Sequence, residues 1–562
     1  MMIASGSRPG VVAECVRAAV EAPDVRYAVD RMVVRGGRIF GWGWISDRYR
    51  AIEAVSLIIE GDAWRSQLSV NYGLARDDVG RALPGFVDAA RSGFVATGYT
   101  RPGVIRRFAI EARYTDGDKA TFDVTSSVES VARGRRRLRE IGWILRAVAR
   151  RARHGDFRGI LARARAQNYL APSLQDDEFA RALRSQAVGG ERITIMFDHA
   201  MGGGANIYRE RAIEERVRAG HVVLLCTYNL PTLDYRLALR RNSDGGPVFR
   251  VSTFVPLDAL IAEGRIAEIV LNSPVSFDEP LVFAEWLTAV RKGHPSVRLT
   301  VAVHDYFVAC PSFPLLDADG RYCGIPALAQ CESCIARHRA SYVALTPRTT
   351  IAAWRAIWGR CLDAADEVRC FSESTKTLLL RAYPGLDDRT CVSIVPHRVD
   401  YMPARLPKID PSAALTIGVI GHISEQKGAG IVREIVARLD RERRDARVVV
   451  IGTLDARVGS PRLSVTGTYR RDDLVDLLEA HGINMLLFPS ICAETFSYVI
   501  EEATRLRLPI VAFDIGAPGD RLRGNPDARL CATVSADEAF DALVAFHRER
   551  GVALESATSA AG

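Results

Sequence analysis

From Ile193 onward, short apolar segments alternate with longer segments of helical periodicity, and this alternation constrains the fold more than any other feature of the chain. Such an order is typical of a doubly wound parallel sheet. A proline-spaced connector, 396–411, interrupts the series, which starts again at Leu415. We therefore predict two Rossmann-like α/β domains that face a cleft, where ligands usually bind. The predicted strands are 193–197, 222–227, 266–271, 299–304, 367–371 and 391–395, then 415–420, 448–451, 463–466, 483–488 and 509–513.

The segments before this series have a different character. Residues 27–127 contain short strand patterns of period two, with an Asp116-Gly117 pair that suits a tight hairpin, so we predict a small β-sandwich. On one predicted strand, Trp42 and Trp44 point to the same face, which suits either stacking on sugar rings or a place in the core. The predicted domains are a β-sandwich accessory domain at 1–130, basic amphipathic helices and a linker at 131–190, a first α/β domain at 191–400 with an insert at 310–334, and a second at 401–555.

Positive charge is concentrated in one segment. The 562-residue chain has a net charge of +8, and residues 133–165 alone carry 12 arginines and two acidic residues. The rest of the chain sums to −2, so a generally basic nucleic-acid-binding protein is excluded and one local anionic contact is expected. With Trp143 near an apolar stripe, this segment predicts an anchor on anionic lipid. The alternative is a charged helix packed across the domains with its arginines in water.

No stretch of the sequence is long and apolar enough for a membrane-spanning helix, which needs about 18 such residues. The first residues also lack the apolar core of a signal peptide, so we expect a cytoplasmic protein. The 11 cysteines are an odd number, which argues against a disulfide framework. Four of them follow the spacing Cys-x12-Cys-x7-Cys-x2-Cys and predict a structural zinc site; unligated thiols and an iron–sulfur cluster are the alternatives. These four are Cys310, Cys323, Cys331 and Cys334.

Two glycine-rich loops follow predicted strands. In 201–208, Gly203 and Gly204 can bring backbone N–H groups close to a phosphate, or simply form a tight strand-to-helix turn. The third glycine of a dinucleotide fingerprint is absent, because Ile207 stands there. In 421–428, Lys427 next to a glycine can present its ammonium to a phosphate, although the spacing is not that of a P-loop and a solvated lysine is the alternative.

The most informative segment is 488–502, in which Glu494 follows a predicted strand and Glu502 comes after seven intervening residues. We expect Glu502 about two turns into the next helix, whose N-terminus near 496–498 suits an anionic group. Two carboxylates that flank such an end can accept hydrogen bonds from sugar hydroxyls. Paired glutamates are common on solvated helices, but these two follow Phe-Pro-Ser at the end of a buried strand.

Together these segments resemble glycosyltransferase family four, retaining enzymes of the GT-B fold, over roughly residues 190–550. The resemblance implies a nucleotide-sugar donor held by the second α/β domain, an acceptor on the first and no catalytic metal. It implies that Glu502 binds the ribose and Lys427 the diphosphate. Glu494 and the backbone amides of Thr495, Phe496 and Ser497 would then hold the sugar and phosphates, with Gly203 and Gly204 closing from the other side. The family usually has arginine where this chain has His422, so another arginine would have to supply that charge.

His304, in a His-Asp pair at the end of a predicted strand, matches the family histidine near the transferred sugar. A packed or solvated histidine is the alternative. Because the leaving phosphate can take the acceptor proton, we do not assign His304 as a literal base. Similar cysteine-bearing inserts after His-Asp occur in some polysaccharide-assembly glycosyltransferases that this stretch resembles.

We therefore predict a retaining glycosyltransferase in which His304, Glu494 and Lys427 act on the reacting groups. The expected donor is a GDP, UDP or dTDP sugar, and the expected acceptor is a lipid-linked surface polysaccharide such as O-antigen or capsule, at the inner face of the cell membrane. The alternatives are a nucleotide-sugar epimerase of the same fold and a non-catalytic glycan-binding or zinc-containing scaffold. A zinc-dependent nucleic-acid-binding protein fits poorly, because the cysteine loop holds Asp317, Asp319 and Glu332 against Arg321.

Overall fold

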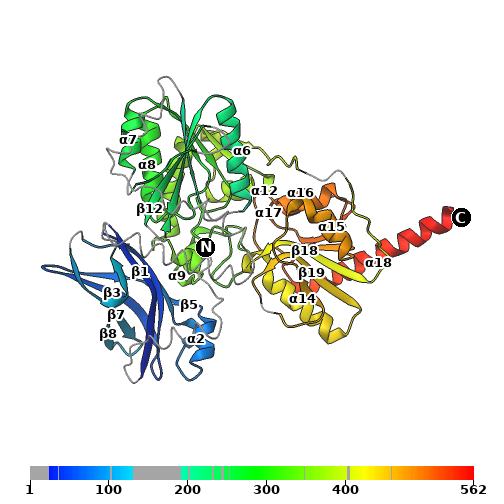
Figure 1. Ribbon diagram of the computed structural model, residues 1–562, viewed down its shortest axis with the longest axis horizontal. Helices are drawn as coiled ribbons and strands as arrows, with labels where there is room; N and C mark the ends of the chain where they lie inside the picture. The colour runs from blue at the N-terminus through cyan, green and yellow to red at the C-terminus, as the bar shows by residue number, and fades with distance from the viewer. Residues whose placement is uncertain are drawn as a thin grey trace. The chain divides into compact units, whose positions relative to one another are not determined.

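The computed structural model describes residues 24–130 except 36 and 102–103, residue 181, and residues 192–561 except 200–202, 231–232, 242–245, 252–253, 347, 402–404 and 457. The described chain divides into two compact units (Figure 1). The first contains the described residues up to Thr300 together with Cys334–Ala364, and the second contains Val301–Ser333 and the described residues from Ala365 onward. The basic segment at 133–165 lies outside the described residues.

The N-terminal part of the first unit consists of two sheets, which we call the N-terminal sheets. One has the order β5-β6-β2-β1-β9 and the other the order β4-β3-β7-β8. Their inward residues alternate along each strand and share one core, which includes Ile39, Leu57 and Ile110. The strands are β1 (Val25–Arg35), β2 (Arg38–Asp47), β3 (Ile52–Gly61), β4 (Arg65–Ser69), β5 (Asn71–Leu74), β6 (Gly93–Tyr99), β7 (Ile105–Tyr114), β8 (Lys119–Asp123) and β9 (Val128–Ser130).

The outward tryptophans of β2 differ in exposure. Trp44 is 1% exposed and packs against Val79 of helix α2 (Asp77–Ala82) and Ala89 of the short helix η1 (Ala89–Arg91). Stacking on a sugar ring requires an accessible aromatic face, so the core interpretation is the right one for Trp44. Trp42 is only half-buried, and a role in glycan binding stays a prediction there.

The α/β part of the first unit has strands in the order β13-β12-β11-β10-β14-β15. Strands β11 and β14 are parallel to β10, but β12 and β13 extend the sheet in antiparallel fashion and were not predicted. Arg236 and Arg240 flank the apolar residues at the centre of β12, so its buried character is not apparent from the sequence. The strands are β10 (Ile193–Asp198), β11 (Val222–Asn229), β12 (Asp234–Arg240), β13 (Val248–Val251), β14 (Ile266–Leu271) and β15 (Arg298–Ala302).

A buried ion-pair cluster joins the N-terminal sheets to this α/β part within the first unit. The Asp234 carboxylate, at the start of β12, is fully buried. Arg35 from β1 donates to its Oδ2 at 2.6 Å, and Arg250 from β13 donates to the same oxygen at 2.7 Å. The negative charge of Asp234 is therefore compensated inside the protein, where an unpaired carboxylate would be costly.

Helices cover both faces of the α/β sheet in the first unit (Figure 1). Helix α6 (Gly204–Arg218) packs Ala212 and Ile213 against β10, β11 and β14. Helices α7 (Val255–Ala262) and α8 (Pro280–Gly293) lie on the other side in Figure 1. There, Phe283 of α8 packs edge-on against Phe197 of β10, with ring centroids 4.8 Å apart.

The second unit contains a six-stranded parallel sheet in the order β20-β19-β18-β21-β22-β23. Counted from β18, this is the strand order of a Rossmann fold, and it confirms a parallel sheet in the C-terminal part of the chain. The strands are β18 (Leu415–Ile423), β19 (Ala446–Leu454), β20 (Leu463–Val465), β21 (Met485–Phe488), β22 (Ile510–Phe513) and β23 (Ala528–Cys531). The parallel pair β16 (Glu367–Cys370) and β17 (Val392–Ile394) belongs to the same unit.

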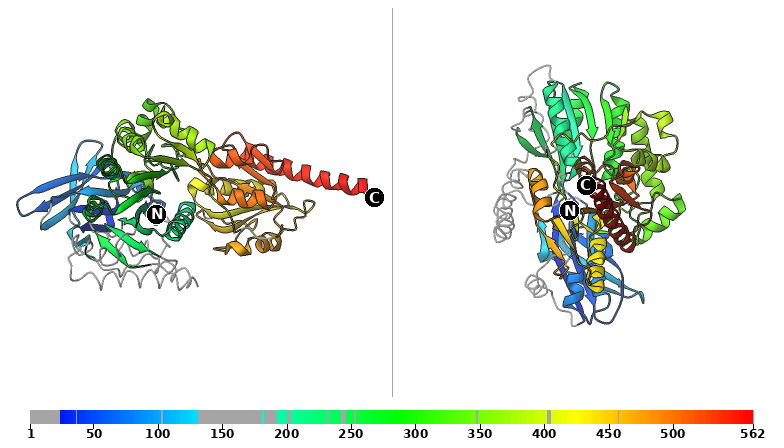
Figure 2. Two further views of the ribbon diagram at one scale, coloured as in Figure 1. Left: turned by 90° about the horizontal axis from the view of Figure 1, so that it is seen from above. Right: turned by 90° about the vertical axis from the view of Figure 1, so that its right-hand side faces the viewer.

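The apolar core of this unit lies on both faces of the six-stranded sheet. Helices α14 (Ala429–Glu442) and α18 (Ala536–Ala561) pack on one face. Helices α15 (Leu474–Ala480), α16 (Tyr498–Arg505) and α17 (Gly516–Leu522) contribute to the core on the other. Helix α18 extends well past the sheet in Figures 1 and 2. Among the described helices, none combines the length and apolar character that a membrane crossing requires.

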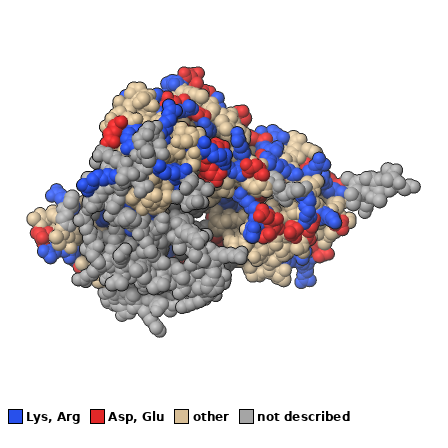
Figure 3. Space-filling model, turned by 45° about the horizontal axis from the view of Figure 1, so that its top comes forward, with Lys and Arg blue, Asp and Glu red and all other residues tan. Residues whose placement is uncertain are grey.

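Charged side chains of both signs are mixed on the face of the molecule that Figure 3 shows. On the face shown in Figure 3, basic and acidic residues are interspersed, with uncharged areas between them. This agrees with the near-neutral sum of the chain outside 133–165.

Candidate active site

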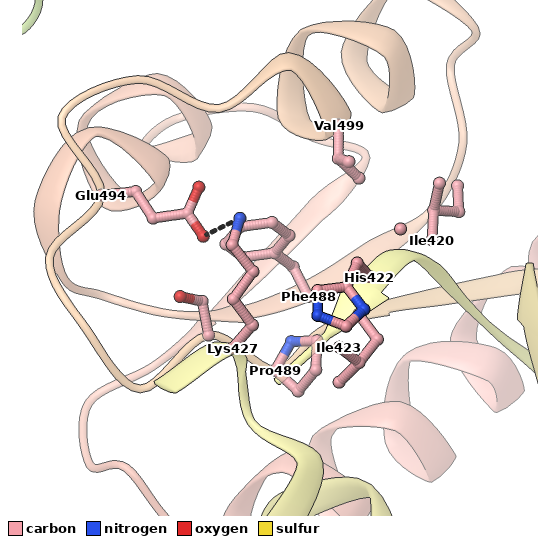
Figure 4. A pocket seen from close by; sticks show the side chains of 10 residues that line it. Ile420, His422, Ile423, Lys427, Phe488, Pro489, Glu494 and Val499 are labelled. Atoms are coloured by element: carbon pink, nitrogen blue, oxygen red, sulfur yellow. Dashed lines mark ion pairs between the residues drawn. The ribbon is translucent and has the colours of Figure 1, made fainter. Parts of the chain in front are cut away.

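The candidate site lies at the carboxyl ends of β18 and β21. These two strands are neighbours at the point where the strand order of the sheet reverses, and doubly wound sheets bind their ligands there. The loop from β18 to α14 and the loop from β21 to α16 border a small open pocket (Figure 4). Its lining consists of Ile420, Gly421, His422, Ile423, Lys427, Phe488, Pro489, Ser490, Glu494 and Val499.

Lys427 and Glu494 form an ion pair in this pocket. Lys427 Nζ lies 3.2 Å from Glu494 Oε1, and Figure 4 shows the two side chains pointing towards each other from different loops. The Lys427 side chain is 47% exposed, whereas that of Glu494 is 12% exposed. The nearby Glu494 carboxylate raises the pKa of Lys427 despite the opposing effect of burial. Lys427 is therefore a cation with room for a second anionic partner.

The backbone fixes Lys427 in place. Lys427 ends the short helix η4 (Glu425–Lys427), and Gly428 follows with φ of +86°. A Cβ at Gly428 would lie 2.0 Å from the carbonyl oxygen of Pro489, so only glycine allows this approach of the two loops. The Ile491 N–H also donates to the carbonyl of Gln426 at 3.2 Å.

Glu494 is held from the opposite side. Its carbonyl accepts a hydrogen bond from the N–H of Ala517 at 2.8 Å. Gly516, with φ of +60°, packs so closely that a Cβ would lie 2.8 Å from the same carbonyl oxygen. Both members of the ion pair therefore stand on tightly packed backbone, as preorganised electrostatic groups must.

Helix α16 begins beside Glu494. Ser497 is its N-cap, and its side chain makes no capping hydrogen bond. The first N–H groups of the helix therefore depend on other partners, and an anion can serve as one. We predicted that Glu502 would lie about two turns into the helix. It lies about one turn into α16, because the helix begins at Tyr498.

The Glu502 carboxylate is almost completely buried, with 3% exposure. Burial raises its pKa, whereas a hydrogen bond from Tyr401 and the charge of Arg471 oppose that shift. Tyr401 Oη donates to Glu502 Oε1 at 2.8 Å, and Arg471 Nε lies 3.9 Å from the same oxygen. The guanidinium of Arg471 also lies over the Tyr401 ring, 4.4 Å from its centroid. Sequence reasoning did not identify Tyr401 or Arg471.

His422 occupies the position where the resembled family has arginine. Its Nδ1 lies 2.6 Å from Thr453 Oγ1, and its Nε2 lies 3.5 Å from Asp455 Oδ2. Burial raises the pKa of Asp455, and the charge of His422 opposes that shift. The side chain of His422 is 60% exposed and lines the same pocket as Lys427.

His304 follows β15 and belongs to the same unit as these residues. Its ring stacks on Phe371, with centroids 4.3 Å apart and an interplanar angle of 22°. Thr495 Oγ1 donates to the His304 carbonyl at 2.9 Å, which brings His304 to the loop that precedes α16. Phe496, in the same loop, stacks at 4.4 Å on His397, a residue that the sequence analysis placed only in a connector.

Gly203 and Gly204 lie in the first unit. Gly203 is the N-cap of α6 with φ of +95°, and Gly204 is the first residue of that helix. Strand β10 and helix α6 thus lie on either side of this loop, and its contact with a donor phosphate stays a prediction.

The predicted zinc site is not supported. Among the residues that the structure describes, which include Cys310, Cys323, Cys331 and Cys334, no group of three or more His, Cys, Asp or Glu side chains is placed to hold a metal. Cys331 and Cys334 lie on helix α9 (Leu328–Arg337), and Cys331 Sγ donates to the Pro326 carbonyl at 3.5 Å.

Comparison with known proteins gives one family match. Residues 414–549, which contain the whole β18–β23 sheet, match the family model described as "Glycosyl transferases group 1". No curated protein matches the chain.

Several solved structures are similar at low sequence identity. Sucrose-phosphate synthase from Thermosynechococcus elongatus is 15% identical, with a TM-score of 0.41 over 65% of this chain and 95% of that one. HepE from Anabaena, in complex with UDP and glucose, is 14% identical, with a TM-score of 0.40 over 64% of this chain and 93% of HepE. TarM from S. aureus is 12% identical, with a TM-score of 0.35 over 71% and 86%. At TM-scores this low we draw no conclusion from these likenesses.

The family match covers the strands and loops that carry His422, Lys427, Glu494 and Glu502. Residues 414–549 thus match a group 1 glycosyl transferase model, and we conclude that the chain is a glycosyltransferase.

Proposed function

We propose that this enzyme is a retaining glycosyltransferase of family four that binds the diphosphate of its donor between Lys427 and the N-terminus of α16. One observation carries the proposal: a half-exposed lysine, a helix N-terminus without a side-chain cap and the buried Glu502 carboxylate follow one another at the switch point of the sheet. An ammonium and free N–H groups suit a diphosphate, whereas a buried carboxylate suits ribose hydroxyls.

These residues would act mainly on the departing diphosphate. Cleavage of a nucleotide sugar develops positive charge at the anomeric carbon and negative charge on the leaving phosphate. The Lys427 ammonium and the N–H groups of α16 are fixed before the reaction, so they stabilise the negative charge without reorganisation. Glu494 would orient the sugar and Lys427 together, and His304 would lie beside the transferred sugar. The leaving phosphate would take the proton of the acceptor hydroxyl.

We further propose that the acceptor is a lipid-linked surface polysaccharide presented at the inner face of the cell membrane. Support comes from the sequence of 133–165, where 12 arginines accompany an apolar stripe. That segment lies outside the described residues. An anchor there would raise the effective concentration of a membrane-bound acceptor without changing the donor site.

The test is a panel of UDP, GDP and dTDP sugars incubated with the full-length protein. We expect one of them to be hydrolysed slowly, with release of the nucleoside diphosphate, and NMR of the first-formed sugar to show a retained anomeric configuration. A Glu494→Gln variant, which keeps the shape of the side chain, should lower the turnover. Conversion of the donor into an isomer still attached to its nucleotide would favour the epimerase instead. If no nucleotide sugar is bound or cleaved, the donor-site proposal fails.

A further inference from the structure

His397 connects several parts of the candidate site. It lies in the connector between β17 and β18, and it is only 8% exposed. One face of its imidazole stacks on the Phe496 ring, with centroids 4.4 Å apart and planes 26° apart. Phe371 packs against it at 4.4 Å in a near-perpendicular arrangement. Neighbouring rings thus fix the imidazole in position.

His304 lies next to the same Phe371 ring. The His304 and Phe371 rings are stacked 4.3 Å apart, and the centroids of His304 and His397 are 5.2 Å apart. Phe371 is 1% exposed, so it cannot move without displacing its neighbours. The orientation of His304 therefore depends on a ring that also packs against His397.

At its polar edge, His397 reaches the nucleotide side of the site. Its Nδ1 lies 3.0 Å from Tyr498 Oη, and Tyr498 is the first residue of α16. The Tyr498 ring lies 5.3 Å from the Arg471 guanidinium and 6.3 Å from the Tyr401 ring. Tyr401 in turn donates to Glu502. A continuous series of contacts thus runs from Glu502 to His304 through His397.

We propose that His397 is a positioning residue for sugar transfer, which ties the His304 ring to the first residue of α16. Its flat ring fits against Phe371 and Phe496, and its polar edge forms a hydrogen bond with the hydroxyl of the buried Tyr498, whose loss has a cost in free energy. No aliphatic side chain supplies both the flat ring and the hydrogen bond. The proposal rests on the donor site proposed above, because it assumes that His304 serves the sugar and α16 the phosphates.

Three variants separate stacking from hydrogen bonding. His397→Phe keeps a flat ring and removes the hydrogen bond, Tyr498→Phe removes the same bond from the other side, and His397→Ala removes both. His481→Asn is the matched control, because His481 precedes β21 and so lies at the opposite edge of the parallel sheet from the site. Each variant is measured for nucleoside diphosphate affinity by calorimetry and for kcat and KM of donor hydrolysis.

We expect His397→Phe and Tyr498→Phe each to lower kcat about three- to tenfold, as loss of one buried hydrogen bond implies, with nucleoside diphosphate affinity within about twofold of the wild type. The double variant, which combines His397→Phe with Tyr498→Phe, should have a kcat no lower than that of either single variant, because both substitutions remove the same hydrogen bond. Equal kcat for the wild type and His397→Phe would overturn the proposal. So would a double variant whose loss is the product of the two single losses.

A second readout does not depend on turnover. In the wild type, Phe371 stacked at 4.3 Å shields the His304 ring, so its NMR resonances should stand apart from those of exposed histidines. We expect them to move in His397→Phe, further in His397→Ala, and not in His481→Asn. Unmoved His304 resonances in His397→Ala would refute the positioning role even in an inactive preparation. Failure of the wild type to bind any nucleoside diphosphate would instead refute the proposed donor site.

Discussion

The Lys427–Glu494 pair allows a prediction in which two substitutions act in opposite directions. Lys427→Met removes a charge-assisted contact to the diphosphate, worth about 1.5–3 kcal/mol, and should weaken nucleoside diphosphate binding by roughly 10- to 100-fold. Glu494→Gln keeps the shape of its side chain but removes a negative charge 3.2 Å from Nζ. It should strengthen nucleoside diphosphate binding while lowering sugar turnover.

The size of the second effect follows from the geometry. A phosphate oxygen that contacts Nζ at about 3 Å on the side away from Glu494 lies about 6 Å from that carboxylate. Two unit charges at that distance repel each other by about 0.7 kcal/mol in a water-like dielectric, which we use because the Lys427 side chain is 47% exposed. A diphosphate with two such charges should therefore bind up to about tenfold more tightly to Glu494→Gln.

The assay is isothermal titration with the nucleoside diphosphate that the wild type binds. Lys119→Met is a matched control, because Lys119 pairs with Glu111 at 3.1 Å in the N-terminal sheets with similar exposure. It should leave the affinity unchanged. If Lys427→Met binds as the wild type does, or if Glu494→Gln weakens binding as much as Lys427→Met, the assignment of these charges is wrong.

Four further predictions concern other parts of the chain. Because burial raises the pKa of Glu502 above its ordinary 4.5, its ionisation lowers the stability of the folded state as the pH rises through the window that begins near 4.5. Glu502→Gln should therefore raise the Tm relative to the wild type more at pH 7 than at pH 4, while donor affinity falls; a lower Tm at pH 7 would contradict this. Gly428→Ala should lower the Tm and donor affinity together, since its Cβ would meet the Pro489 carbonyl, whereas Gly430→Ala, where only the end of the Arg433 side chain is near, should change neither. Chelation with EDTA should leave the Tm unchanged and elemental analysis should find less than one zinc per chain; a stoichiometric zinc lost in Cys331→Ser would reverse the correction made above. Replacing Arg135, Arg136, Arg137 and Arg139 with Gln should reduce binding to anionic liposomes at low salt and spare donor hydrolysis; a wild type that ignores such vesicles would remove the membrane proposal.

Much of the site could be predicted because residues at the ends of parallel strands meet at one edge of a sheet. Lys427 and Glu494 each follow a recognisable buried strand, and their pairing at 3.2 Å follows from the strand order. The hydrophobic pattern of each strand and the glycines that follow it indicated where the strand ends, and so where Lys427 and Glu494 lie. The same logic located the helix that begins at Tyr498, within the predicted range 496–498, although Glu502 lies about one turn into it and not two.

Other features left no periodic signal. Strand β12 was missed because it contains Arg236 and Arg240, and a hydropathy pattern interprets arginine as exposed, although Arg236 is only 7% exposed. His397 was missed because it lies in an irregular connector, where only the tertiary packing of Phe371 and Phe496 gives it a role. The cysteine spacing could suggest a tetrahedral site, but spacing does not determine where the sulfur atoms point.

The buried Asp234 carboxylate has a consequence for how the first unit unfolds. Arg35, one of its arginine partners, comes from β1 in the N-terminal sheets, and another, Arg250, comes from β13 in the α/β sheet. Separating the N-terminal sheets would therefore take a charge pair apart inside the protein, so these sheets and the α/β part should melt in a single cooperative transition. The N-terminal sheets would then fold together with the α/β part and would not form an independent domain. A chain shortened to begin after residue 130 would lack Arg35 beside the buried Asp234 and should be less stable.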